Sequence, residues 1–110
     1  MNAMANALTD VPDLRRFRQA VTEIYGDRVE RVVLFGSRAR GDARADSDYD
    51  IAVFMRRLSD RATAMNQLSD IGTDILYDGG PVIHALPYPA GAYRERTALM
   101  QEIRRDGVDL

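Results

Sequence analysis

A short apolar run at residues 31–35 ends at a Gly-Ser pair, and a second apolar run starts with two closely spaced aspartates. The first run reads Arg-Val-Val-Leu-Phe, which is typical of a strand buried on both faces. The second predicts a strand over residues 48–55. The ten residues between them, 38–47, are polar and predict one helical turn followed by a loop. We therefore expect two neighbouring strands with a polar connection at one end.

Helices are predicted before and after these strands. Residues 13–25 carry apolar side chains in steps of three and four, as do a segment that starts at residues 58–60 and a third segment at 92–105. The predicted buried side chains are Leu14, Phe17, Val21 and Ile24 in the first helix, Ala62, Met65, Leu68 and Ile71 in the second, and Tyr93, Leu99 and Ile103 in the third.

The remaining segments complete the predicted fold. A Gly-Gly-Pro turn leads to a third strand at residues 82–86 and a loop at 87–91, and a short terminal strand is expected at 108–110. The order α-β-β-α-β-α predicts an α+β fold, a sheet with helices packed on it. A chain of 110 residues is expected to form a single domain over residues 1–110. We expect residues 1–10 to be a flexible N-terminal segment.

Composition excludes several classes of function. The chain has 15 basic and 17 acidic residues, and a net charge of −2 argues against indiscriminate binding of nucleic acid. Without cysteine, no disulfide or thiol chemistry is available. The N-terminus lacks the features of a signal peptide, and no apolar stretch approaches membrane-spanning length. We therefore expect a cytoplasmic protein with no membrane partner.

The pair Gly36-Ser37 is a candidate phosphate site. Glycine lets an anion approach the backbone N–H groups closely, and the serine hydroxyl adds a donor. Gly-Ser also ends many ordinary strands, so the pair alone does not settle the function.

Asp48 and Asp50 are candidate metal ligands. Positions i and i+2 of a strand face the same side, so both carboxylates are expected to project together. Two adjacent carboxylates repel each other unless they share a cation, and their oxygen atoms suit Mg²⁺. The alternative is that both simply line a solvated strand start.

Together, the Gly-Ser turn and the aspartate pair would hold a Mg–nucleoside triphosphate. They also resemble the motif of minimal nucleotidyltransferases, which belong to the DNA-polymerase-β-like superfamily. The matching residues are Val33-Leu34-Phe35-Gly36-Ser37-Arg38-Ala39-Arg40-Gly41 and Ser47-Asp48-Tyr49-Asp50-Ile51.

This resemblance implies a small mixed sheet of the polymerase-β palm type, with helices on one side. Gly36 and Ser37 would hold the triphosphate of ATP, and Asp48 and Asp50 would hold Mg²⁺ or Mn²⁺. The implied reaction transfers a nucleoside monophosphate to an acceptor and releases pyrophosphate. Many such proteins resemble antitoxins that adenylylate a tyrosine of a helical HEPN toxin, so such a toxin is the implied partner.

His84 occupies the position where the family carries a third carboxylate. The third strand reads Val-Ile-His-Ala-Leu and contains no acid. An imidazole titrates near neutrality and can serve as a general base, although it is a poor ligand for Mg²⁺. The alternative is a strand histidine that hydrogen-bonds a neighbour.

Arg38 and Arg40 flank the turn and are candidate phosphate contacts. The alternative is a solvated loop in which nearby aspartates balance them.

Two further functions stay open. The chain could be a catalytically inactive module that neutralises a partner by direct contact, or a nucleotidyltransferase that acts on RNA or a small molecule. The second is disfavoured because no basic arm is present. The sequence does not decide between a monomer and a homo-oligomer.

Overall fold

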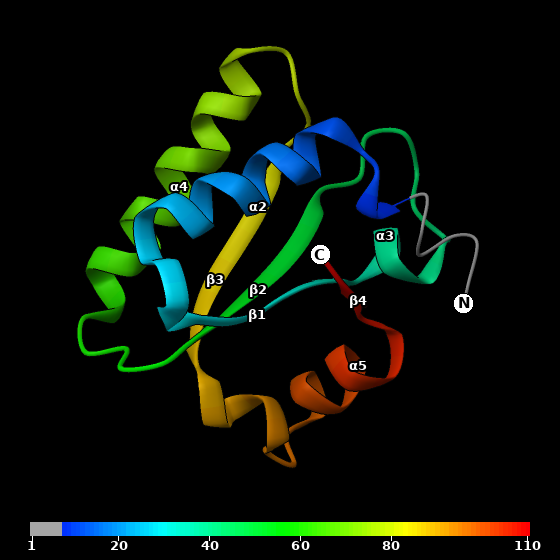
Figure 1. Ribbon diagram of the computed structural model, residues 1–110. Helices are drawn as coiled ribbons and strands as arrows, with labels where there is room; N and C mark the ends of the chain where they lie inside the picture. The colour runs from blue at the N-terminus through cyan, green and yellow to red at the C-terminus, as the bar shows by residue number, and fades with distance from the viewer. Residues whose placement is uncertain (1–7) are drawn as a thin grey trace.

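One four-stranded sheet organises the computed structural model, which describes residues 8–110 (Figure 1). Strands β1 (Val29–Phe35) and β2 (Tyr49–Met55) pair antiparallel at its centre. Strand β3 (Ile83–Pro89) adds to β2 in parallel, and the short β4 (Val108–Asp109) pairs antiparallel with β1. The sheet is therefore mixed, as the family resemblance implied.

Helices cover both faces of this sheet. Helices α2 (Pro12–Tyr25) and α4 (Arg61–Tyr77) lie on one face, and α5 (Ala98–Asp106) lies on the other (Figure 1). The first face packs through side chains such as Leu14, Phe17, Ile51, Val53 and Leu68. The second packs through Val33, Ala52, Phe54, Met100 and Ile103.

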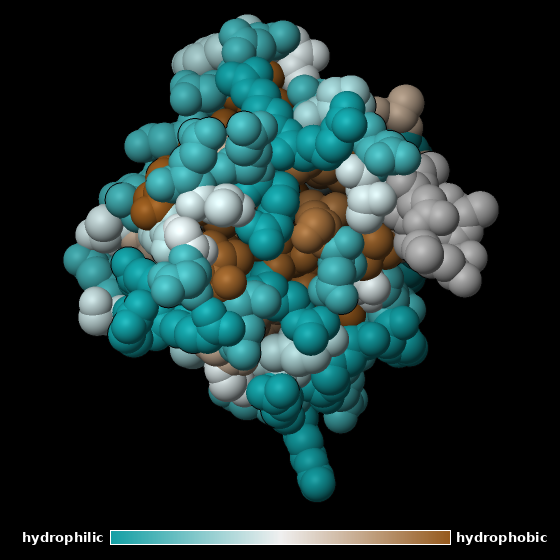
Figure 2. Space-filling model, in the orientation of Figure 1, coloured by the Kyte–Doolittle hydropathy of each residue, from teal (hydrophilic) through white to brown (hydrophobic). Residues whose placement is uncertain are grey.

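The expectation of helices on one side only is wrong. Successive side chains of β2 point to opposite faces, and this strand is apolar at every position from Ile51 to Met55. Both faces therefore have to be covered. Figure 2 shows the face that carries α2 and α4, where hydrophilic side chains dominate and apolar surface is visible near the centre.

The helices form where periodicity predicted them, but the buried stripe differs in detail. In α2, Ile24 is 47% exposed and Tyr25 is buried in its place. In α4, Met65 is 40% exposed, and Ala62 is also exposed. The stripe that faces the sheet is instead Ala64, Leu68, Ile71 and Ile75. Both stripes of α4 fit a helical repeat, so only packing against the sheet selects between them.

The C-terminal third departs furthest from prediction. Strand β3 continues through Pro87 to Pro89, where a loop was expected. Proline is compatible with β3 because this strand lies at the sheet edge, where an N–H can be missing without loss of a sheet hydrogen bond. The single helix predicted at 92–105 is instead a 3₁₀ turn, η2 (Ala90–Arg94), followed by α5, whose first turn is capped by Thr97.

Short elements connect these helices and strands. The 3₁₀ turn η1 (Gly26–Arg28) joins α2 to β1, and α3 (Ser37–Arg40) is the single helical turn predicted after Gly36. Of the predicted flexible segment, residues 1–7 lie outside the described residues, whereas Leu8 packs against the core. Within residues 8–110, no helix combines the length and the apolar character needed to cross a bilayer.

Candidate active site

The phosphate-turn candidate lies where β1 ends and α3 begins. Gly36 has φ 74° and ψ −157°, a conformation that favours glycine, and it is the N-cap of α3. The backbone N–H groups of Arg40 and Ala39 donate to the Gly36 carbonyl. The first N–H groups of a helix have no acceptor within it, so those at Ser37 and Arg38 are available to an anion.

Asp50 packs directly against this turn. Because Phe35 and Asp50 are paired across β1 and β2, the Asp50 side chain lies beside Gly36. A Cβ built on Gly36 would lie 2.6 Å from Asp50 Oδ2, which is too close for any real side chain. The turn and the carboxylate therefore lie side by side, and their shared role in binding stays a prediction.

Asp48 is placed differently from the prediction. It was expected as the first residue of the strand, but β2 begins at Tyr49 and Asp48 is an exposed residue of the preceding loop. The strand hydrogen bonds begin next to it, where the Tyr49 N–H donates to the Val82 carbonyl over 3.0 Å. Asp48 is therefore fixed by the loop rather than by the sheet.

The environment of Asp50 disfavours its charged form. Partial burial raises the pKa of Asp50, and the negative charges of Asp48 and Glu102 raise it further. His84 acts in the opposite direction and lowers it. A bound cation would relieve the same repulsion, which is the electrostatic condition expected of a metal ligand.

His84 is adjacent to Asp50. The two residues are paired across the parallel strands β2 and β3, and Nδ1 of His84 lies 3.7 Å from Oδ1 of Asp50. The His84 side chain is 65% exposed, so an acceptor group can reach it from solvent. His84 therefore lies beside Asp50; its standing in for a third acid and its role in proton transfer stay predictions.

The two arginines of the motif are engaged within the protein. The Arg38 guanidinium donates to the backbone carbonyls of Ala45 and Ser47. Arg40 donates to Glu102 over 2.9 Å and to Asp42 over 3.3 Å. The predicted contact of either arginine with phosphate stays a prediction. The alternative for Arg40, in which a nearby aspartate balances its charge, is observed in its hydrogen bond to Asp42.

Sequence reasoning missed Glu102. It lies on α5, far along the chain, yet its charge reaches Asp50 and its side chain pairs with Arg40. Only the packing of α5 on the face that carries Asp50 brings it to the site.

The donor set suits a divalent cation that is shared with a phosphate. Among residues 8–110, no group of three or more His, Cys, Asp or Glu side chains is arranged to hold a metal ion. Two carboxylates are nevertheless the usual protein contribution to a Mg²⁺ ion whose other positions are filled by water and substrate phosphates. Asp48 and Asp50, beside the Gly36 turn, fit that pattern.

Residues 14–106 match the family described as "Nucleotidyltransferase domain", and the chain belongs to this family.

Two relatives come from Methanocaldococcus jannaschii. The chain is 36% identical to "Putative protein adenylyltransferase MJ0141" over 45 residues, which is 41% of this chain and 46% of that protein. It is 33% identical to "Putative protein adenylyltransferase MJ0604" over 73 residues, or 66% of this chain and 67% of that protein. The chain thus spans about half of the first relative and two thirds of the second.

Two solved structures share the fold. One, a toxin–antitoxin crystallised with AMP-PNP, superposes with a TM-score of 0.61 at 17% identity over 90% of this chain and 72% of the other. The second, from Sulfolobus solfataricus and described as a "putative nucleotidyltransferase", has a TM-score of 0.56 at 21% identity, over 99% of this chain and 87% of the other. At these identities the likeness establishes the mixed sheet and its helices.

Proposed function

We propose that this chain is a Mg²⁺- or Mn²⁺-dependent nucleotidyltransferase that transfers AMP from ATP to a hydroxyl group of a partner protein. The observation that carries the proposal is the contact between Asp50 and Gly36. It brings a carboxylate suited to a metal against a turn suited to phosphate. Positioning and charge neutralisation are most of what such a transfer asks of a protein.

Each residue of the site has its own role in the proposed reaction. In the reaction, the acceptor oxygen bonds to the α-phosphorus of ATP, the bond from that phosphorus to the bridging oxygen breaks, and pyrophosphate leaves. The backbone at Gly36 and Ser37 holds the phosphates. Asp48 and Asp50 would hold the cation, which would neutralise charge on the phosphates. His84, beside Asp50 and open to solvent, accepts the proton of the acceptor hydroxyl.

A protein acceptor is favoured by the relatives. Both proteins of M. jannaschii carry the name of a protein adenylyltransferase, and the fold recurs in a toxin–antitoxin bound to an ATP analogue. We propose a tyrosine hydroxyl of a helical HEPN-type toxin as the acceptor, which would make this chain the antitoxin of a cytoplasmic pair.

One observation favours a second function. The position beside Asp50 on β3 carries His84, so the strand position where the family carries a third carboxylate has no acid here. The alternative is therefore a module that neutralises its partner by covering it, with nucleotide binding as a remnant or a regulator.

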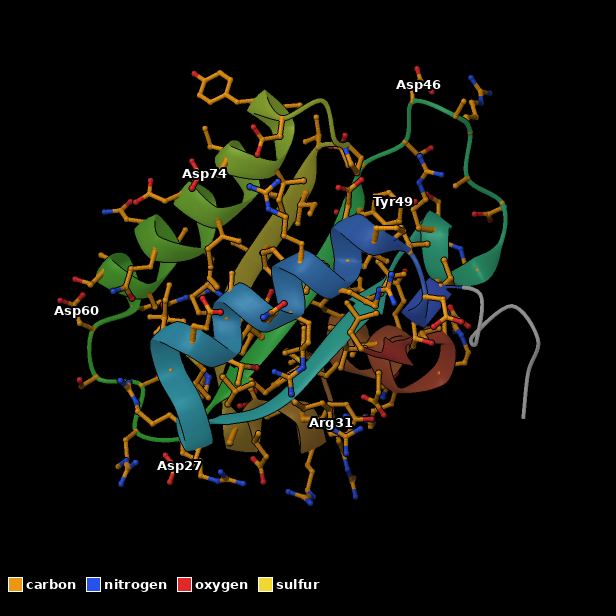
Figure 3. All side chains as sticks on the ribbon, turned by 45° about the horizontal axis from the view of Figure 1, so that its top comes forward. Asp27, Arg31, Asp46, Tyr49, Asp60 and Asp74 are labelled. Carbon is orange, nitrogen blue, oxygen red and sulfur yellow. The ribbon has the colours of Figure 1, made fainter. Side chains whose placement is uncertain are left out.

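The test is transfer of label from α-labelled ATP to the protein encoded by the adjacent gene. We expect label on a tyrosine with wild type and none with Asp48→Asn/Asp50→Asn. Asp46→Asn is the matched control, because Asp46 points away from the molecule at the crest of the same loop (Figure 3). Wild-type transfer by the double variant would disprove the mechanism. Neutralisation of the partner that survives the double change would support the covering function instead.

A further inference from the structure

Asp48 lies just outside the sheet, and its two neighbours in the chain determine its position. It precedes β2 and belongs to the loop of residues 41–48, which rises from α3 and returns to the start of β2 (Figure 1). The loop has one local closure of its own. In it, the Ser47 N–H donates to the Arg44 carbonyl and the Arg44 N–H donates to Ser47 Oγ.

The start of the loop is tied to α3, because the Gly41 and Asp42 N–H groups donate to the Ser37 carbonyl and Arg40 donates to Asp42. What remains is the connection that holds its returning end, residues 45–48.

Arg38 makes that connection from α3. Its Nε and Nη2 donate to the Ser47 carbonyl over 3.2 and 2.9 Å, and Nη2 also donates to the Ala45 carbonyl over 3.1 Å. Its guanidinium carbon lies 4.5 Å from the centroid of the Tyr49 ring. Ser47 and Tyr49 are the two residues that flank Asp48. One side chain therefore holds both neighbours of the candidate metal ligand.

This arrangement needs arginine. A guanidinium is planar and carries several donors in fixed directions, so it can bridge two carbonyls while its face stacks on a ring. A lysine ammonium keeps the charge but cannot do both at once. Because Nε and Nη2 are used on the Ser47 and Ala45 carbonyls, those donors are not free for a nucleotide phosphate. Tyr49 lies at the base of the loop, next to α3, where such stacking is in reach (Figure 3).

We propose that Arg38 is a positioning residue that fixes Asp48 for metal binding, rather than a residue that contacts the nucleotide. This inference rests on the proposed function only in naming the cation that Asp48 serves. Without the Arg38 connection, the returning end of the loop, residues 45–48, samples many conformations, and Asp48 is seldom placed to share a cation with Asp50.

The test compares Arg38→Lys with Arg44→Lys, the same chemical change at a residue of the loop itself. Hydrogen–deuterium exchange of the peptide that spans residues 41–49 reports the loop directly, without metal or nucleotide. Binding of Mn²⁺ in the presence of AMP-PNP reports the metal site. Binding of AMP-PNP in EDTA reports direct phosphate contacts. Circular dichroism confirms that each variant is folded, and Tyr49→Leu removes the stacking partner without touching an arginine.

For Arg38→Lys we expect exchange in the loop to rise about 3- to 10-fold and Mn²⁺ affinity to fall by a similar factor, as loss of charge-assisted hydrogen bonds predicts. Tyr49→Leu should produce the same pair of changes to a smaller degree, and Arg44→Lys neither. Affinity for AMP-PNP in EDTA should stay at the wild-type value. Unchanged loop exchange in Arg38→Lys, or a loss of AMP-PNP affinity in EDTA, would overturn the proposal. If the loop and metal effects appear but wild type transfers no AMP, the proposed function fails and the positioning role stands.

Discussion

The Oδ2 atom of Asp50 lies 2.6 Å from the point that a Cβ would occupy on Gly36. This contact joins the end of β1 to the start of β2, and it follows from the pairing of Phe35 with Asp50 across the two strands. A carboxylate can lie this close to a turn only because the turn residue has no side chain. The glycine therefore serves two purposes: it permits the backbone conformation, and it leaves room for the carboxylate.

Gly36→Ala tests both purposes. The substitution forces a side chain into a backbone conformation with φ 74° and displaces the Asp50 carboxylate. We expect a loss of about 1–3 kcal/mol in the free energy of unfolding, the range for backbone strain of this kind, and at least a roughly tenfold loss of AMP transfer. Urea unfolding and the labelling assay measure the two effects.

Gly79→Ala is the matched control. Gly79 has φ 90°, but a Cβ there would meet nothing within 4 Å. The control should therefore lose stability and keep transfer. Equal losses of transfer in the two variants would show that the Asp50 contact does not matter.

Asp50→Asn is expected to stabilise the fold. The pKa of Asp50 is raised by burial, so its protonated form is favoured by folding. The stability that protonated Asp50 adds is fully present below its unfolded pKa of about 3.9, and it is lost as pH rises through its folded pKa. At neutral pH the ionised carboxylate therefore opposes folding, and asparagine removes this effect.

Thermal unfolding across a pH series measures the difference in stability between Asp50→Asn and wild type. The melting temperature of Asp50→Asn should exceed that of wild type by about 1–3 °C at pH 7, with the gap closing as pH falls toward about 4. The exposed Asp46→Asn should show no such trend. Saturating Mg²⁺–AMP-PNP should reverse the order, because the ligand stabilises only the protein that binds it. If ligand-free wild type were more stable than Asp50→Asn at pH 7, the conclusion that ionised Asp50 opposes folding would be wrong.

Much of the site was predictable because strand alternation is a local property. The apolar run from Val32 to Phe35 and the alternation of the next strand are enough to place Asp50 beside the Gly36 turn, and the family resemblance drew attention to His84 next to Asp50. Asp48 precedes the strand, so alternation did not place it. The role of Arg38 was not predictable, because its partners are backbone carbonyls that no residue type encodes. Glu102 was missed for a different reason: alternation shows which residues share a face of the sheet, but not which helix covers that face.

The Arg40–Glu102 ion pair should contribute to stability more than a fully exposed pair. Its side chains are 37% and 33% exposed, whereas those of Arg16 and Asp78 are 45% and 65% exposed at a similar distance. Double-mutant cycles with alanine should give a coupling energy of about 0.5–1 kcal/mol for the first pair and about 0–0.5 kcal/mol for the second. Both should fall in about 1 M salt, an ionic strength that screens surface charges. Equal coupling in the two pairs would show that partial burial beside α5 adds nothing.

The proposed role of His84 as the general base can be tested by substitution. If His84 is the base, His84→Ala should lower AMP transfer about 100-fold, since a general base commonly contributes that much. Its Mn²⁺ affinity should stay close to that of wild type.

His84→Asp places another carboxylate beside Asp50, whose Oδ1 lies 3.7 Å from Nδ1 of the natural histidine. Repulsion between the two carboxylates should destabilise the metal-free protein, and a bound cation should restore its stability. Transfer and melting temperature with and without Mg²⁺ measure these effects. An alanine variant as active as wild type would remove His84 from the reaction. A large gain of transfer in the aspartate variant would show that the natural chain is impaired in catalysis, which would favour neutralisation of a partner by contact.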